Sequence, residues 1–347
     1  MKKPEFLQQK VMLRVIYALI PVTIGAIYFF GWRVLGIIIV SSVFAVITEW
    51  IMTTYRKAKI SYACFVTSFI FALSLPPTTP FWIVAIGAIV AILFGKEVFG
   101  GFGRNVFNPA IVGRAFVYVA FPVELTSRFV PVFRGFPGGF TEWSYELSKK
   151  SSLYLQEAAL KVQDAISAAT PMWANRDFGF VTNVKNLFLG NIGEVFTYNG
   201  TRKVLAAGSS GEVCAAIIIL AGIYLIATKT AQWRLILSTL LGAVILNLIL
   251  YYPAGLKDVP PIEFSLFSGG LLFASVFMVT DPISAPKNKG SQWIYGILIG
   301  MLTIFFRYKA IFAGGIGFAI LFGNMFAPSI DLWINNYKKK KKSKGNE

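Results

Sequence analysis

The chain has 347 residues, of which 56% are hydrophobic and 14% are charged, and its formal net charge is +17. Soluble domains contain nearer a quarter of charged residues, and here the apolar residues fall in blocks of about 20, the length that crosses a bilayer. The composition excludes an ordinary soluble protein and assigns the excess of basic residues to membrane topology, not to nucleic acid. With no histidine and two cysteines, the chain alone can build neither an iron–sulfur cluster nor a four-ligand zinc site.

Each apolar block predicts a membrane-spanning helix, and the chain has about ten of them. Three blocks, 61–75, 81–95 and 292–306, are short and are interrupted or flanked by Pro or Gly. Such spans are typical of broken or half helices, which a membrane tolerates only where protein or water covers the freed backbone. The expected fold class is an all-α integral membrane protein. Its predicted spans are residues 11–30, 34–52, 61–75, 81–95, 106–122, 213–228, 233–252, 264–280, 292–306 and 311–334.

The lysines and arginines predict the orientation of these spans. Placing the N-terminus in the cytoplasm puts most basic residues of the short loops on the inner side, as the positive-inside rule requires. Both termini are then cytoplasmic, and the long polar segment 123–212 lies outside. The basic tail at 338–347 is expected to fix this topology or to contact anionic lipid, and docking to a partner is the alternative.

The two halves of the membrane part resemble each other. Segment 96–103 aligns with 309–317, with one insertion, and a Pro-rich break precedes each, at 75–80 and at 280–286. Because each half has an odd number of spans, the second half is expected to enter the membrane from the opposite side, as an inverted repeat. The alternative is that Gly and Pro merely recur in membrane helices. The predicted division is a five-helix repeat at 1–122, an extracytoplasmic loop at 123–212, a second five-helix repeat at 213–337 and the tail at 338–347.

One string in the outside loop has a specific chemical meaning. It contains Asp164, Ser167, Ala168, Ala169 and Thr170, and it resembles the pattern Asp-x-x-Ser/Thr-Gly-Ala-Thr, at which an exported flavin transferase links FMN through its phosphate to the Thr hydroxyl. Ala168 stands where the pattern usually has Gly, so a small residue is kept and close backbone approach remains open. The alternative is an ordinary run of small residues at a helix end.

Further strings extend a family resemblance over nearly the whole chain: Gly103–Ala110, Thr280–Pro282, Asn288–Gly290 and Asn324–Pro328. With the Thr170 motif, they resemble the D subunits of the Rnf complex, an ion-translocating ferredoxin:NAD+ oxidoreductase. They also resemble the related B subunits of the Na+-translocating NADH:quinone oxidoreductase. The B subunits begin with an added cytoplasmic segment, whereas the first span here begins almost at once, so the resemblance favours the D subunits of Rnf. It implies an electron-carrier subunit in a bacterial cytoplasmic membrane, working with the other Rnf subunits.

The resemblance also implies two flavins. FMN would be linked covalently to Thr170 on the outer side by a flavin transferase, and riboflavin would be held non-covalently within the membrane. Electrons would pass through this subunit and drive Na+ or H+ across the bilayer. The residues that match the riboflavin site are Asn105 and Asn108. Three positions apart, they are expected to share one helical face and to offer amide donors and acceptors to the flavin edge; capping of a broken-helix backbone is the alternative.

Ionisable residues in or near the spans are costly in a membrane, so each is a functional candidate. They are Glu49, Glu97, Arg114 and Asp281. Arg114 is expected to hold an anionic form of a flavin or to pair with an acid of a partner. Glu49 lies near a cytoplasmic end, and pairing with Arg56 is its alternative role.

Asp281 is a candidate for a cation pathway, because freed carbonyls at a helix break help to hold a cation. Its alternatives are capping the next turn or pairing with Lys287 or Lys289. The rival class for the whole chain is a secondary transporter, in which Asp281 and Asn324 would line a solute site and Thr170 would bear no flavin. A membrane anchor without cofactors is the third class. The Thr170 motif favours the flavin-bearing subunit over both.

Overall fold

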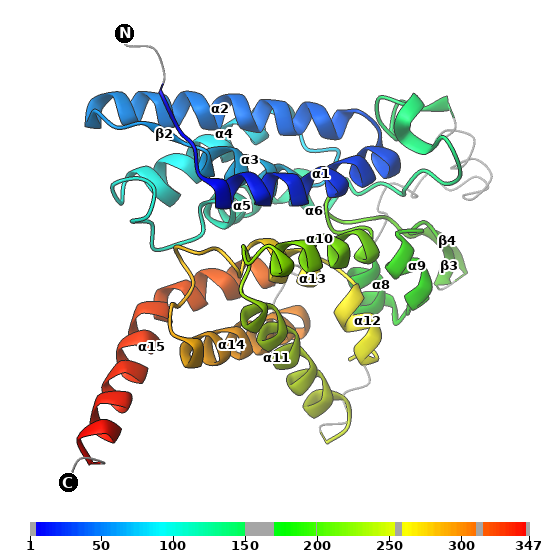
Figure 1. The fold of residues 1–347 in the computed structure, drawn as a ribbon. Coiled ribbons are helices and arrows are strands. Elements are labelled where there is room, and N and C mark those ends of the chain that lie inside the picture. Colours follow the sequence, from blue (N-terminus) through cyan, green and yellow to red (C-terminus); the bar gives the residue numbers. More distant parts are fainter. Residues whose placement is uncertain (1–4, 150–169, 199, 254–258, 310–314, 345–347) are drawn as a thin grey trace.

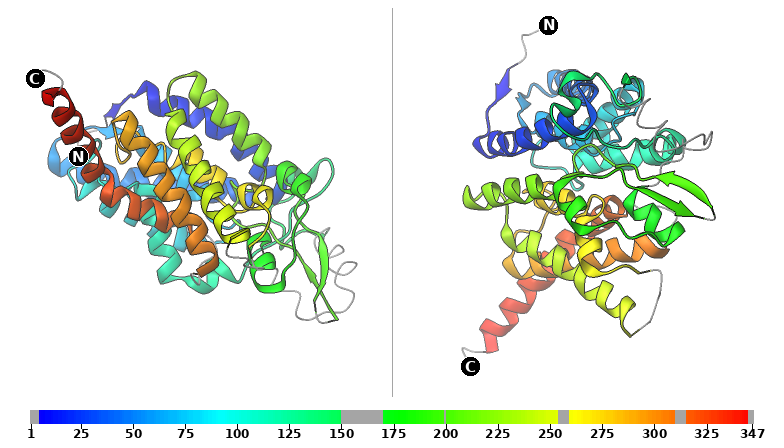
Figure 2. Two further views of the ribbon diagram at one scale, coloured as in Figure 1. Left: turned by 90° about the horizontal axis from the view of Figure 1, so that it is seen from below. Right: turned by 90° about the vertical axis from the view of Figure 1, so that its right-hand side faces the viewer.

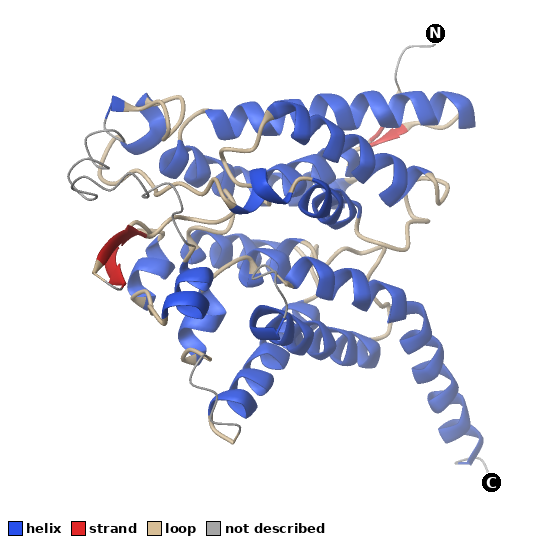
Figure 3. Cartoon of the chain, turned by 180° about the vertical axis from the view of Figure 1, so that it is seen from behind, coloured by secondary structure: helices blue, strands red, loops and turns tan. Residues whose placement is uncertain are grey.

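The computed structural model describes residues 5–149, 170–198, 200–253, 259–309 and 315–344, and most of them are helical. Figure 1 shows two layers of helices, with the first half of the chain above and the second half below. Both termini lie at one end of the molecule, and a small module with a β-hairpin lies at the opposite end (Figures 1 and 3).

Each layer is formed by one half of the membrane part. The first contains α1 (Lys10–Phe30), α2 (Arg33–Arg56), α3 (Ala63–Leu73), α4 (Phe81–Ile92), the π-helix η1 (Leu93–Glu97) that continues α4, and α5 (Pro109–Ala120). The second contains α10 (Ala215–Ala227), α11 (Trp233–Tyr251), α12 (Ile262–Phe267), α13 (Leu271–Phe277), α14 (Lys289–Lys309) and α15 (Ile316–Lys344). Before α1, the strand β1 (Phe6–Leu7) pairs in parallel with β2 (Ile60–Ser61).

The segment between the layers folds into short elements at the end of the molecule away from the termini. They are α6 (Pro122–Thr126), the 3-10 helix η2 (Gly138–Thr141), α8 (Pro171–Phe178), α9 (Val184–Leu189), and the antiparallel strands β3 (Val195–Tyr198) and β4 (Thr201–Val204). Val195 pairs with Val204 in the register of this hairpin.

In the part of the chain that the structure describes, four helices, α1, α2, α11 and α15, are long and apolar enough to cross a membrane. Helix α11 has large apolar side chains on its outer surface. They are spaced every four residues, and each is more than a third exposed: Leu237, Leu241, Ile245 and Ile249. Residues four apart share one helical face, so an apolar stripe lies on the outside of the fold. Lipid acyl chains would cover this apolar stripe. The prediction of a largely helical integral membrane protein is confirmed.

The structure corrects two of the predicted spans. The expected span 264–280 is two helices, α12 and α13, separated where Gly269 adopts a left-handed φ of +63°. The expected short span 292–306 is the 21-residue helix α14, so the prediction of a half helix there is wrong. Ser291 and Gln292 in its first turn are buried polar residues, and the Ser238 hydroxyl of α11 donates to the carbonyl of Gln292 (3.2 Å).

The packing follows the same pattern in both layers. Helix α4 contacts both α2 and α5, and α14 contacts both α11 and α15. Likewise α1 packs on α3, and α10 packs on α13. The layers meet where α1 packs against α10, and the right-hand view of Figure 2 shows the same stacking from the side.

Glycines bring α11 and α14 unusually close together. A Cβ on Gly242 of α11 would overlap the backbone of Ile297, and one on Gly300 of α14 would overlap the backbone of Thr239 and Ala243. Gly296 and Gly300 are four residues apart on α14, the small-xxx-small spacing that lets membrane helices approach backbone to backbone.

We expect Gly300→Ala to destabilise the protein by about 1–3 kcal/mol, because the added methyl group must push two backbones apart. Gly290→Ala, on the same helix, is the matched control, since a Cβ there meets its nearest neighbour, Ile334, at an ordinary 3.7 Å. Thermal unfolding in detergent compares the two variants. Equal midpoints would contradict the close approach of α11 and α14.

Candidate functional site

Two pockets lie between the layers, and five of the residues that the sequence singled out line one or the other of them. The first, which we call the Asn108 pocket, has a lining that includes Lys96, Asn105, Asn108 and Asp281. The second, the Thr170 pocket, has a lining that includes Thr170, Arg114, Ser209 and Glu212.

Helix α5 joins the two pockets. Asn108, its N-cap, lines one pocket, and Arg114 lines the other. The two residues are six positions apart, which is about 9 Å along a helix axis. The predicted riboflavin residues and Arg114 therefore belong to different sites, and the structure does not bring Arg114 to the asparagines.

Two further short helices run between the pockets in opposite directions. Helix α3 begins at the Asn108 pocket, which Ala63 lines, and the chain reaches the Thr170 pocket just after it, at 74–76. Helix α13 begins after Gly270 in the Thr170 pocket and ends with Phe277 in the Asn108 pocket. The ends of α3 and of α13 thus line the two pockets.

Asn108 joins the two layers through hydrogen bonds. Its Oδ1 accepts from the backbone N–H of Ala110 (3.0 Å) and Ile111 (3.4 Å), which caps α5. Its Nδ2 donates to the carbonyl of Met278 (3.1 Å), and its own backbone N–H donates to Oδ1 of Asn324 (3.1 Å). The capping role, left as an alternative by the sequence, is the one that these contacts show.

The expectation that Asn105 and Asn108 share a helical face is wrong. Both precede α5, which begins at Pro109. The residue before a proline is disfavoured in the helical region, and Asn108 has an extended backbone with ψ of 118°. Asn105 Nδ2 instead donates to the carbonyl of Phe107 (3.0 Å). A loop, not a helix, presents the two asparagines to the pocket.

Asp281 stands on the wall of the Asn108 pocket, after the end of α13. Its carboxylate accepts from the backbone N–H of Ile283 (3.3 Å) and from the hydroxyl of Ser284 (2.7 Å), so it caps the following turn. In the described part of the chain it forms no ion pair with Lys287 or Lys289. The turn-capping alternative holds, and the lysine-pairing alternative does not.

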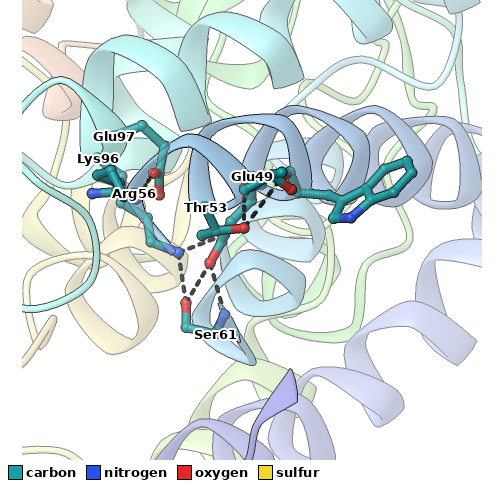
Figure 4. Close-up of polar contacts among 8 residues, drawn as sticks. Glu49, Thr53, Arg56, Ser61, Lys96 and Glu97 are labelled. Carbon is teal, nitrogen blue, oxygen red and sulfur yellow. Dashed lines mark hydrogen bonds and ion pairs between the residues drawn. The ribbon is translucent and has the colours of Figure 1, made fainter. Parts of the chain in front are cut away.

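A buried charge network lies beside the same pocket (Figure 4). Lys96 Nζ donates to Glu49 Oε2 (2.6 Å) and to the Ser61 hydroxyl (2.6 Å), and Glu49 Oε1 accepts from the Ser61 backbone N–H (2.7 Å). Arg56 pairs with Glu97, so the expected pairing of Glu49 with Arg56 is wrong. Because Lys96 and Glu97 lie in a π-helical turn, where the α-helical register is shifted, two consecutive charged residues are both buried.

Thr170 is the N-cap of α8 and is 8% exposed. Its hydroxyl oxygen accepts from the backbone N–H of Trp173 (3.4 Å) and lies on the wall of the Thr170 pocket. The other motif residues, Asp164, Ser167 and Ala169, lie outside the described residues.

Arg114 lines the same pocket as Thr170, together with a cluster of polar groups and glycines. Its Nη2 donates to the Ser209 hydroxyl (3.3 Å), which in turn donates to Glu212 Oε2 (3.0 Å). The Ser209 backbone N–H donates to Glu212 Oε1 (3.0 Å). Sequence reasoning missed Ser209 and Glu212; the visible signal was an acid directly before an apolar span.

The two cysteines take no part in either pocket. Cys64 is fully buried in a small apolar cluster with Ala45 and Ile92, and both Cys64 and Cys214 are free thiols. Among the described residues, no group of three or more His, Cys, Asp or Glu side chains has the arrangement of a metal site.

Comparison with known proteins places the chain in a family. The profile of the NQR2, RnfD, RnfE family matches residues 4–340. The B subunit of the Na(+)-translocating NADH-quinone reductase of Azotobacter vinelandii (strain DJ / ATCC BAA-1303) is 33% identical over 315 residues, 89% of this chain and 68% of that protein. The B subunit of the same reductase from Klebsiella pneumoniae (strain 342) is 32% identical over 339 residues, 93% of this chain and 70% of that protein.

The B subunit from Pseudoalteromonas atlantica (strain T6c / ATCC BAA-1087) is 32% identical over 290 residues, 82% of this chain and 62% of that protein. The chain thus spans about two thirds of the length of these relatives. With a match that extends over both layers and both pockets, this chain belongs to the NQR2, RnfD, RnfE family.

Proposed function

We propose that this chain is the membrane electron-carrier subunit of an ion-translocating oxidoreductase, with FMN bound covalently to Thr170 and riboflavin held in the Asn108 pocket. The observation that carries the proposal is the placement of two pockets at the two ends of α5, one holding the motif threonine and the other the two motif asparagines. When bound, the flavins supply the redox chemistry, and the protein supplies binding, orientation and electrostatics.

The Thr170 pocket suits a phosphate ester of a flavin. Gly208, Gly269 and Gly270 line it, so backbone can approach a bulky group closely. Arg114 would hold the phosphate, because a guanidinium matches phosphate oxygens in shape and charge. Ser209, already bonded to both Arg114 and Glu212, keeps that guanidinium in place.

The Asn108 pocket suits an uncharged flavin with a large ring system. Its wall is largely apolar, with residues such as Val66, Ile70 and Val276, and this surface would accept the ring faces. One N–H of the Asn105 amide donates to the carbonyl of Phe107. Among the described residues, the other N–H and the oxygen of that amide are free for a ligand. Asn108 is committed to the helix cap, so its role is to hold the pocket in shape.

The directions of two short helices fit the predicted inverted repeat, which we include in the proposal. In each layer a short helix ends in a proline-containing break, Ser74–Pro76 in one pocket and Thr280–Pro282 in the other. Helices α3 and α13 run in opposite directions, as an inverted repeat requires. With positive residues inside, the Asn108 pocket faces the cytoplasm, where both termini lie, and the Thr170 pocket faces the exterior of a bacterial cytoplasmic membrane. The lysine tail would then meet anionic lipid.

The host complex is proposed to be the Rnf ferredoxin:NAD+ oxidoreductase, with the other Rnf subunits as partners and a flavin transferase as the modifying enzyme. The relatives' own names favour a second candidate, a Na+-translocating NADH-quinone reductase. Either complex couples electron flow to Na+ or H+, and Asp281 places a carboxylate beside the Asn108 pocket for a cation pathway. The electron donor oxidised by the purified complex distinguishes the two candidates.

We expect Thr170→Val to abolish covalent flavin, because the variant lacks the hydroxyl that forms the ester. The chain is co-expressed with a flavin transferase, and flavin fluorescence of the denatured band is measured on a gel. Thr182→Val is the matched control, a buried threonine of the same outer segment that is absent from the pocket lining. A wild-type band without fluorescence, with the transferase active on another substrate, would refute the covalent assignment.

We expect Asn105→Ala to weaken riboflavin retention in the Asn108 pocket by about twofold to tenfold, the loss of one neutral hydrogen bond. Flavin released by acid precipitation of the purified protein is quantified against the covalent flavin that stays on the chain. Asn191→Ala, at an exposed loop position, is the control. Unchanged riboflavin in Asn105→Ala would exclude Asn105 as a binding residue.

A further inference from the structure

Lys96 lies on the wall of the Asn108 pocket, and neither the motifs nor the family resemblance gives it a role. It is 2% exposed, in the π-helix η1, within a protein whose outer surface is apolar. Charged groups in this environment are costly and mark function more often than stability. The question is therefore what the ammonium does in the pocket wall.

The ammonium is held in a fixed position by two side chains. It donates to Glu49 Oε2 and to the Ser61 hydroxyl, both at 2.6 Å. The Glu49 carboxylate is itself fixed, because its Oε1 accepts from the backbone N–H (2.7 Å) and the hydroxyl (2.9 Å) of Ser61. A lysine ammonium has three N–H donors, and two are used by these described partners. The third N–H is available to a molecule in the pocket.

The charges that line the pocket also indicate that Lys96 binds a molecule there. Among the described residues that line it, Lys96 is the cation and Asp281 is the acid. Asp281 is occupied by Ile283 and Ser284, so an acceptor atom in the pocket has the Lys96 ammonium as its charged donor. A hydrogen bond from a charged donor is about twice as strong as a neutral one.

We propose that Lys96 is a ligand-binding residue of the Asn108 pocket, where it donates its third N–H to a carbonyl or ring-nitrogen acceptor of the flavin. Glu49 and Ser61 are positioning residues that act through Lys96. The proposal rests on the proposed function, since it takes riboflavin as the occupant. A cation beside the ligand also favours the more negative, reduced state, so Lys96 raises the midpoint potential of the bound flavin.

Another buried cation, in the second layer, shows how a purely structural role differs. Arg307, at the end of α14, is also 2% exposed, and it donates to the carbonyls of Ser265 (2.7 Å) and Ser268 (3.0 Å). Those carbonyls lie at the break between α12 and α13, so Arg307 satisfies freed backbone groups. Lys96 is bonded to side chains instead, and the backbone around it does not require a cation.

The test compares the double variant Lys96→Gln with Glu49→Gln against the double variant Lys59→Gln with Glu5→Gln, the exposed Lys–Glu pair of the same region. Removing both partners avoids leaving a single buried charge, which would unfold the protein for an unrelated reason. Covalent flavin on Thr170 reports that each variant is folded and exported. The measurements are riboflavin affinity by titration of the flavin-depleted full chain and the midpoint potential of the bound riboflavin.

We expect the Lys96 and Glu49 double variant to bind riboflavin about tenfold more weakly or worse, with a more negative midpoint potential, and the exposed double variant to match the wild type. Wild-type affinity and potential in the Lys96 and Glu49 double variant would overturn the proposal and leave the pair a structural element. A wild-type protein that binds no riboflavin would instead refute the assignment of the pocket.

Discussion

The fold depends on satisfying the backbone groups that are freed where short helices end inside a membrane protein. Water is absent from the hydrocarbon layer, so every freed N–H and C=O must find a partner within the chain. At the start of α5 the side chain of Asn108 takes two of the freed N–H groups, and it donates to the Met278 carbonyl at the end of α13. One residue therefore closes a break in each layer, and the two layers are held together at that point.

The same constraint explains why pockets and breaks coincide. Within a continuous helix the backbone N–H and C=O groups bond to one another. At a helix end the last of these groups have no partner in the helix and are open to the space between the layers. Helices α3, α5 and α13 all begin or end within the span of the fold, and their ends line the Asn108 and Thr170 pockets. The long helices α1, α2 and α11 present apolar stripes outward, so they form the wall that separates this polar interior from lipid.

Much of the fold could be predicted from the sequence, because span length and hydropathy are local properties. The helices α1, α2, α10 and α11 coincide with predicted spans to within a few residues. The break between α12 and α13 could not be placed, since Gly269 lies in an otherwise apolar run and its left-handed φ is imposed by packing. The motif residues Thr170, Asn105 and Asn108 were found, but their pockets also depend on residues far away in the chain.

Those distant partners are the part that local patterns cannot supply. Lys96 meets Glu49 across 47 positions, and Arg114 meets Ser209 across 95. Such pairings depend on how helices register against one another, and a π-helical turn such as η1 changes that register without a clear sequence signal. For this reason the alternative that the sequence offered for Glu49 was Arg56, which is near in sequence, and the actual partner Lys96, which is near in space, was missed.

The two pockets also differ in how they hold charge. In the Thr170 pocket, Arg114 is linked to the carboxylate of Glu212 through Ser209, so a phosphate entering there would meet a cation that is already partly balanced. In the Asn108 pocket, Lys96 is balanced by Glu49 and has a donor left for the ligand. A redox carrier in a low-dielectric interior gains negative charge with each electron that it accepts. A fixed cation nearby lowers the electrostatic cost of that added charge. Because Glu49 already neutralises Lys96, the flavin that we propose for this pocket would enter it without meeting an unpaired charge, and the ammonium would still favour an added negative charge. Under the proposed function, an ion pair at the wall of the pocket therefore suits a redox carrier better than a lone cation would.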